Sequence, residues 1–109
     1  MAKRRPAYIS FAWSNNLCET LERADRYRRI VFLAGMQPVC PVHTYAGIVD
    51  LENPEELKAF SEICRSEAQR CPVLVVCGDD TNDTVMEEIA IARRTGNTVT
   101  SLNGLRVGG

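Results

Sequence analysis

The sequence predicts a small three-layer, doubly wound α/β domain with a mostly parallel sheet of about four strands. Two observations lead to this prediction. Apolar runs that suit strands alternate along the chain with segments whose apolar residues recur at helical spacing. One run, Val73–Cys77, is wholly apolar, which is typical of an inner parallel strand covered on both faces. A chain of 109 residues can bury its own core, so we expect residues 1–109 to form a single domain.

The expected elements follow one another as strand, helix, strand, helix, strand, helix and strand. We expect strands at Ala7–Phe11, Gln37–Val42, Val73–Cys77 and Asn97–Leu102, and helices over about 15–33, 53–70 and 83–95. This alternation implies right-handed crossovers with helices on both faces of the sheet, as in flavodoxin-like and Rossmann-like domains. In such folds, ligands bind at the carboxyl ends of the strands.

Local signals mark several of these boundaries. Pro38 and Pro41 interrupt the second strand, which indicates an edge position. Asn53 and the proline after it are typical of a helix start, and we expect the second helix to bury Leu57 with the apolar residues that follow. We expect residues 43–52 to form a loop and residues 103–109, with three glycines, a loose tail.

Charge and hydropathy exclude several classes of protein. The formal net charge is −1, from 13 basic and 14 acidic residues, which argues against a binder of nucleic acid polymers. No apolar run is long enough to span a membrane, and the first ten residues lack the apolar core of a secretory signal. We therefore expect a cytoplasmic protein that acts neither on membranes nor on nucleic acid polymers.

The cysteines favour packing over metal binding. There are five cysteines and one histidine, His43, and no two cysteines are spaced as C-x-x-C. Structural zinc sites usually draw on closely spaced ligand pairs, so we expect no metal and no cofactor. The thiols are expected to be reduced and mostly buried.

The third predicted helix carries an unusually placed acid. On a helical wheel, Val85, Ile89 and Ala92 form the buried stripe, and Glu88 lies beside it near the end of the third strand. Glu87 points outward, as a surface acid does. A carboxylate directed toward the sheet must be hydrogen-bonded, raised in pKa or used on a ligand. The alternative is a side chain that reaches over the helix edge into water.

The turn before this helix is rich in polar residues. Asn82 or Asp83 is expected to cap the helix, and acids there are stabilised by the free N–H groups of its first turn. The same side chains could instead bind sugar hydroxyls. Ser14 lies in the turn after the first strand, where backbone N–H groups could bind an anion.

The segment Arg70–Ala92, RCPVLVVCGDDTNDTVMEEIAIA, resembles the corresponding stretch of the nucleoside 2-deoxyribosyltransferase superfamily. That superfamily includes the 2′-deoxynucleoside 5′-phosphate N-hydrolases, and small bacterial and phage proteins of unknown function share its layout. The resemblance includes the opening strand, with Tyr8-Ile9-Ser10, and extends over about residues 7–102.

The resemblance implies a role for each matching residue. Glu88 matches the glutamate that attacks the anomeric carbon of deoxyribose, forming a covalent glycosyl-enzyme that water or another base resolves. Asn82, with Asp83 beside it, matches a polar position that contacts the sugar or its phosphate. Tyr8 and Ser10 would help to position the glutamate or the substrate, and Ser14 would lie at the phosphate loop. A domain with such a site is expected to form a homo-oligomer.

Two positions depart from the superfamily pattern, so a second function remains an alternative. Pro72 stands where an aspartate that acts on the base is common, and Ser14 stands where an arginine often holds phosphate. The first hypothesis is a nucleoside or nucleotide hydrolase or transferase that cleaves an N-glycosidic bond. The alternative is a non-catalytic sensor or sequestering protein for a nucleotide-like ligand, or a protein-interaction module.

Overall fold

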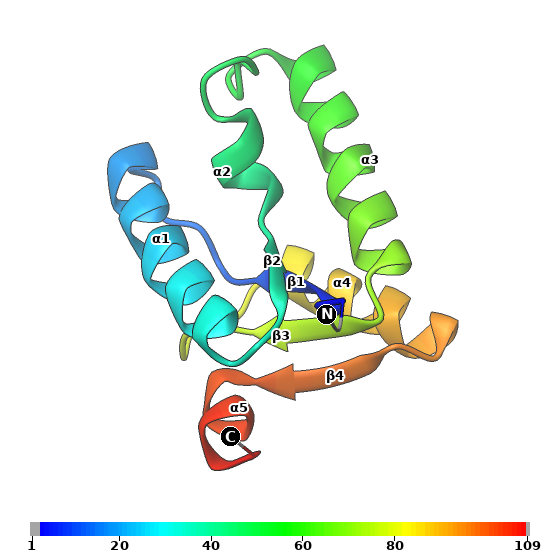
Figure 1. Ribbon diagram of the computed structural model, residues 1–109. Coiled ribbons are helices and arrows are strands. Elements are labelled where there is room, and N and C mark those ends of the chain that lie inside the picture. Colours follow the sequence, from blue (N-terminus) through cyan, green and yellow to red (C-terminus); the bar gives the residue numbers. More distant parts are fainter. Residues whose placement is uncertain (1–2, 109) are drawn as a thin grey trace.

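The computed structural model describes residues 3–108 and contains one sheet of four parallel strands in the order β2-β1-β3-β4 (Figure 1). The strands are β1 (Pro6–Ser10), β2 (Gln37–Val39), β3 (Val73–Val76) and β4 (Thr98–Ser101). The sheet, predicted to be mostly parallel, is parallel throughout, and the inner position of β3 and the edge position of β2 are confirmed. The chain runs outward from β1 to β2 and then crosses back to β3, so the strand order reverses between β1 and β3.

Helices cover both faces of this sheet. They are α1 (Leu17–Leu33), α2 (Pro41–Tyr45), α3 (Pro54–Arg70), α4 (Asp83–Thr95) and α5 (Leu102–Gly108). In Figure 1, α3 and α4 lie against each other on one face, whereas α1 and α5 lie on the other. This arrangement is the three-layer α/β architecture that right-handed crossovers produce. No helix within residues 3–108 is both long and apolar enough to cross a membrane.

Two segments differ from the sequence-based expectation. The second strand ends at Val39, and α2 begins at Pro41, because proline suits the first turn of a helix better than the continuation of a strand. The expected loose tail is helical over α5. Leu102 and Leu105 pack against the core, and the Gly104 N–H donates to Ser101 Oγ at 3.1 Å, which stabilises the first turn of α5.

The helices that frame the site begin at asparagine caps. Asn53 Oδ1 accepts hydrogen bonds from the N–H groups of Glu55 and Glu56 at the start of α3. Asn82 Oδ1 accepts one from the Val85 N–H at 2.9 Å at the start of α4, so Asn82, and not Asp83, is the cap. Once α4 begins at this point, its inward face consists of Val85, Glu88, Ile91 and Ala92.

Candidate functional site

A carboxylate lies buried between the sheet and α4. Glu88 is 5% exposed, and its two oxygens accept hydrogen bonds from two side chains of β1. The Tyr8 hydroxyl donates to Oε2, and the Ser10 hydroxyl donates to Oε1 at 2.7 Å. Tyr8 and Ser10 are two residues apart on a strand, so their side chains face the same helix. Among the residues the structure describes, Glu88 is the only charged side chain buried to this extent.

The surroundings of Glu88 act on its pKa in opposite directions. Burial raises the pKa of the carboxyl above its ordinary value of 4.5, because a charge is poorly solvated there. The hydrogen bonds from Tyr8 and Ser10 stabilise the ionised form and offset part of this rise. Burial and the nearby Glu88 charge raise the pKa of the Tyr8 phenol well above 10, so Tyr8 remains a hydrogen-bond donor at neutral pH.

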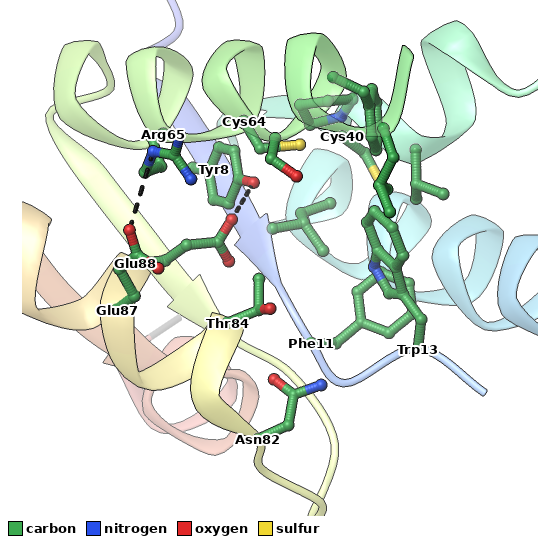
Figure 2. A pocket seen from close by; sticks show the side chains of 16 residues that line it. Tyr8, Phe11, Trp13, Cys40, Cys64, Arg65, Asn82, Thr84, Glu87 and Glu88 are labelled. Carbon is green, nitrogen blue, oxygen red and sulfur yellow. Dashed lines mark hydrogen bonds and ion pairs between the residues drawn. The ribbon is translucent and has the colours of Figure 1, made fainter. Parts of the chain in front are cut away.

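A pocket of about 310 Å³ opens beside this carboxylate, at the carboxyl end of β1 and against α3 and α4 (Figure 2). The wall of the pocket opposite Glu88 is aromatic. Phe11 and Trp13 follow β1, and Phe60 comes from α3, with the Trp13 and Phe60 ring centroids 5.6 Å apart. Flat apolar groups pack well against such a wall. The wall therefore suits a flat ring.

Polar side chains line the other parts of the pocket. Asn82 and Thr84, at the start of α4, lie below Glu88 in Figure 2. Arg65 of α3 and Glu87 of α4 form an ion pair across the rim, with Arg65 Nε 3.7 Å from Glu87 Oε1. The pocket thus combines an aromatic wall, a buried carboxylate and a charged rim.

Three of the six predicted site residues line this pocket, namely Tyr8, Asn82 and Glu88. Ser10 is buried and reaches the site only through its hydrogen bond to Glu88. Asp83 is the exposed first residue of α4 and does not line the pocket. Ser14 lines a separate cavity beside Trp13, and its hydroxyl is engaged in the turn that starts α1.

Helix α3 contributes to the pocket, although the sequence predicts no binding residue on it. Leu57 was expected to be buried, but it is 41% exposed at the edge of the pocket. Arg65 follows the buried Cys64, lines the pocket and reaches Glu87 of α4. Glu87 is exposed, as the helical wheel predicts, and it also lies at the pocket rim, where it pairs with Arg65.

Pro72, where the chain departs from the superfamily pattern, lies outside the lining of this pocket. Pro72 directly precedes β3, at the amino end of the strand, whereas the pocket opens at the carboxyl end of the neighbouring β1. Pro72 is not among the lining residues.

Two cysteines belong to the wall of the pocket. Burial raises the pKa of the Cys40 thiol to about 11 and that of Cys64 to about 12, so both stay protonated at neutral pH. They act as small apolar wall residues rather than as nucleophiles. Within residues 3–108, no group of three or more His, Cys, Asp or Glu side chains is placed to hold a metal ion.

Comparison with known proteins shows which fold the chain shares and to which family it belongs. The chain superposes on a 2-deoxyribosyltransferase from the psychrotolerant bacterium Bacillus psychrosaccharolyticus with a TM-score of 0.70 and 13% sequence identity. The match covers 88% of this chain and 70% of that one, and it shows a shared flavodoxin-like fold. Residues 5–102 match a family described as a domain of unknown function (DUF7768), and the chain belongs to that family. No curated protein matches the sequence significantly.

Proposed function

We propose that the pocket binds a 2′-deoxynucleoside or its nucleotide and that Glu88 cleaves the N-glycosidic bond. The observation that carries the proposal is the buried Glu88 carboxylate, held by two hydroxyl groups beside a pocket with an aromatic wall. The fold shared with a 2-deoxyribosyltransferase and the resemblance at Tyr8, Asn82 and Glu88 both support it.

The geometry suits a carboxylate nucleophile. Each Glu88 oxygen accepts one hydrogen bond, so each keeps a lone pair for the anomeric carbon. One oxygen forms a bond to C1′ as the bond from C1′ to the base nitrogen breaks, and the base leaves with that electron pair. Water then attacks C1′, releases the carboxylate, and supplies the proton that the departed base takes up. A second base in place of water gives deoxyribosyl transfer.

The hydroxyl donors have a definite role in this scheme. A nucleophile must be ionised, and burial alone favours the neutral carboxyl. The hydrogen bonds from Tyr8 and Ser10 favour the ionised form of Glu88 and orient its carboxylate. We assign the sugar to Asn82 and Thr84, which line the lower end of the pocket in Figure 2.

A second candidate function is ligand binding without turnover. It is favoured by the lining of the pocket: among the described lining residues, the acid besides Glu88 is Glu87, which is paired with Arg65, so no free acid is present to protonate the departing base. The two functions share the same pocket and the same class of ligand, and they differ only in whether the base is released.

The test measures release of free base and ligand-induced stabilisation together. The four common 2′-deoxynucleosides and their 5′-monophosphates are incubated with the protein, and free base is quantified by chromatography. Thermal shift is followed in parallel, since a ligand at a hundred times its Kd adds about 2.7 kcal/mol to the free energy of unfolding. Stabilisation without release would establish the binding function, and the absence of both effects would overturn the proposal.

Glu88→Gln is the decisive variant, because it keeps the shape of the side chain but removes the nucleophile. We expect release of base to fall by a factor on the order of 10³ or more. Glu62→Gln, on the exposed outer side of α3, is the matched control and should retain the wild-type rate. Equal rates for the two variants would exclude Glu88 as the nucleophile.

A further inference from the structure

We propose that Arg65 selects ligands that carry a phosphate, and that Glu87 pairs with Arg65 when no such ligand is bound. The inference rests on the proposed function and deepens it, because it favours a nucleotide over a nucleoside as ligand. It assigns this selectivity to α3, a helix from which the sequence analysis predicted no binding residue.

The order of groups along the pocket supports this choice. Figure 2 shows the Glu88 carboxyl between Arg65 on one side and Phe11 and Trp13 on the other, and all four residues line the same pocket. A nucleotide has the same order of parts, because its sugar lies between a flat base and a phosphate. With the base on the aromatic wall and C1′ at Glu88, the phosphate points toward Arg65.

Arg65 has the chemistry that phosphate recognition needs. It is the only basic residue among the described residues that line the pocket. A guanidinium can donate two parallel hydrogen bonds to a phosphate, which a lysine ammonium does not do. Two acids, Glu87 and Glu88, also line the pocket, so a dianionic ligand would be repelled there without a cation.

The ion pair with Glu87 is loose enough to be exchanged. The Arg65 and Glu87 side chains are 42% and 53% exposed, and the Nε to Oε1 distance is 3.7 Å. Ion pairs exposed to this extent contribute little to stability. A phosphate can therefore displace the Glu87 carboxylate from Arg65. Because Glu87 stays beside Arg65, its carboxylate competes with the phosphate for the guanidinium.

Within the described part of the chain, Arg23 also lies near the carboxyl end of β1, but its guanidinium is already engaged. Arg23 of α1 donates to the Ala12 carbonyl oxygen at 3.0 Å and to the Tyr27 hydroxyl at 3.2 Å, and it does not line the pocket. Ser14 replaces the loop arginine implied by the resemblance, and its hydroxyl is engaged with Asn16. Arg65 is thus the cation that remains for a ligand in this pocket.

The experiment compares each of the four common 2′-deoxynucleosides with its own 5′-monophosphate, using isothermal titration of the purified protein. For the base that binds best, we expect the wild type to bind the monophosphate at least tenfold more tightly than the nucleoside. Arg65→Gln should abolish this preference, so that the monophosphate and the nucleoside bind about equally. Arg65→Lys should retain part of it, because the charge remains without the paired donors.

Glu87→Gln acts in the opposite direction. It frees Arg65 from its competitor, so we expect the monophosphate preference to increase by at least threefold, a gain that misfolding cannot produce. Arg94→Gln, an exposed arginine of α4 outside the pocket, changes the net charge as Arg65→Gln does and should leave the preference unchanged.

The outcomes separate the two proposals. If no nucleoside and no monophosphate binds, the proposed function fails, and this inference fails with it. If nucleosides bind but monophosphates bind no more tightly, the inference is overturned while the proposed function stands. An equal loss of preference in Arg65→Gln and Arg94→Gln would also overturn it, because the effect would then be one of net charge.

Discussion

At the scale of single residues, the raised pKa of Glu88 makes the free energy of unfolding depend on pH. Burial raises that pKa above 4.5, the value expected in the unfolded chain. The native state therefore binds a proton to Glu88 at a higher pH than the unfolded state does. As a result, the contribution of Glu88 to the free energy of unfolding increases as the pH falls through its native pKa.

Glu88→Gln removes this dependence, because the amide does not titrate. We expect the free energy of unfolding of the wild type, minus that of the variant, to rise as the pH is lowered from about 8 to about 5. Urea denaturation at a series of pH values measures this difference, in which the titration of all other groups cancels. A difference that is constant or falls over this range would show that the carboxyl is not raised in pKa.

The residues around Glu88 differ in how well the sequence predicts them. Tyr8 and Ser10 were predictable, because strand periodicity places them on one face, and helix periodicity turns Glu88 inward. Arg65 was not, because its position depends on how α3 packs against α4, a contact that no local pattern encodes. Ser14 was expected at a ligand site, but its hydroxyl is engaged in the turn before α1.

At the scale of elements, the two asparagine caps allow structure and function to be separated. Asn53 caps α3 away from the pocket, whereas Asn82 caps α4 and also lines the pocket. Replacing such a cap by alanine costs about 0.5–2 kcal/mol of stability, because an N–H group of the first turn loses its partner. Both caps should therefore contribute to stability, but only one should contribute to binding.

Asn53→Ala and Asn82→Ala form the corresponding pair of variants. We expect both to lower the free energy of unfolding by about 1 kcal/mol in urea denaturation. Only Asn82→Ala should also weaken binding of the ligand found in the thermal shift screen, by about three- to tenfold. If Asn53→Ala weakens binding as much, the effect belongs to stability and Asn82 has no direct role in the pocket.

Short helices were the elements that the sequence predicted least well. The strands and long helices follow from apolar periodicity, which extends over enough residues to be recognised. The five-residue α2 and the seven-residue α5 have little periodicity of their own. They form because Val42, Leu102 and Leu105 pack against the rest of the molecule, which is a tertiary effect.

At the scale of the whole molecule, the core encloses four of the five cysteines. Cys40, Cys64, Cys71 and Cys77 are buried, whereas Cys18 is exposed on α1. Burial raises the pKa of Cys71 to about 11 and that of Cys77 to about 12, as it does for the two pocket cysteines. Reactivity depends on the thiolate and on access, so the packed molecule should protect all four.

A chromogenic disulfide reagent at pH 8 measures this protection directly. We expect one thiol to react rapidly in the native protein and all five to react once the protein is unfolded in guanidinium. Cys18→Ser should remove the rapid phase and leave the slow one. Two or more rapid thiols would contradict the packing of the core, and fewer than five after unfolding would reveal a disulfide.

The position of Pro38 has a consequence for self-association. Gln37 donates its N–H to the Arg5 carbonyl at 2.9 Å, toward β1, so the next residue of β2 directs its backbone groups to the free edge of the sheet. That residue is Pro38, which has no N–H to offer. A strand from another molecule would find no donor at the middle of this three-residue edge, so β2 resists strand addition and the aggregation that follows from it. Copies of this protein that assemble would therefore meet through helix faces or through the edge of β4.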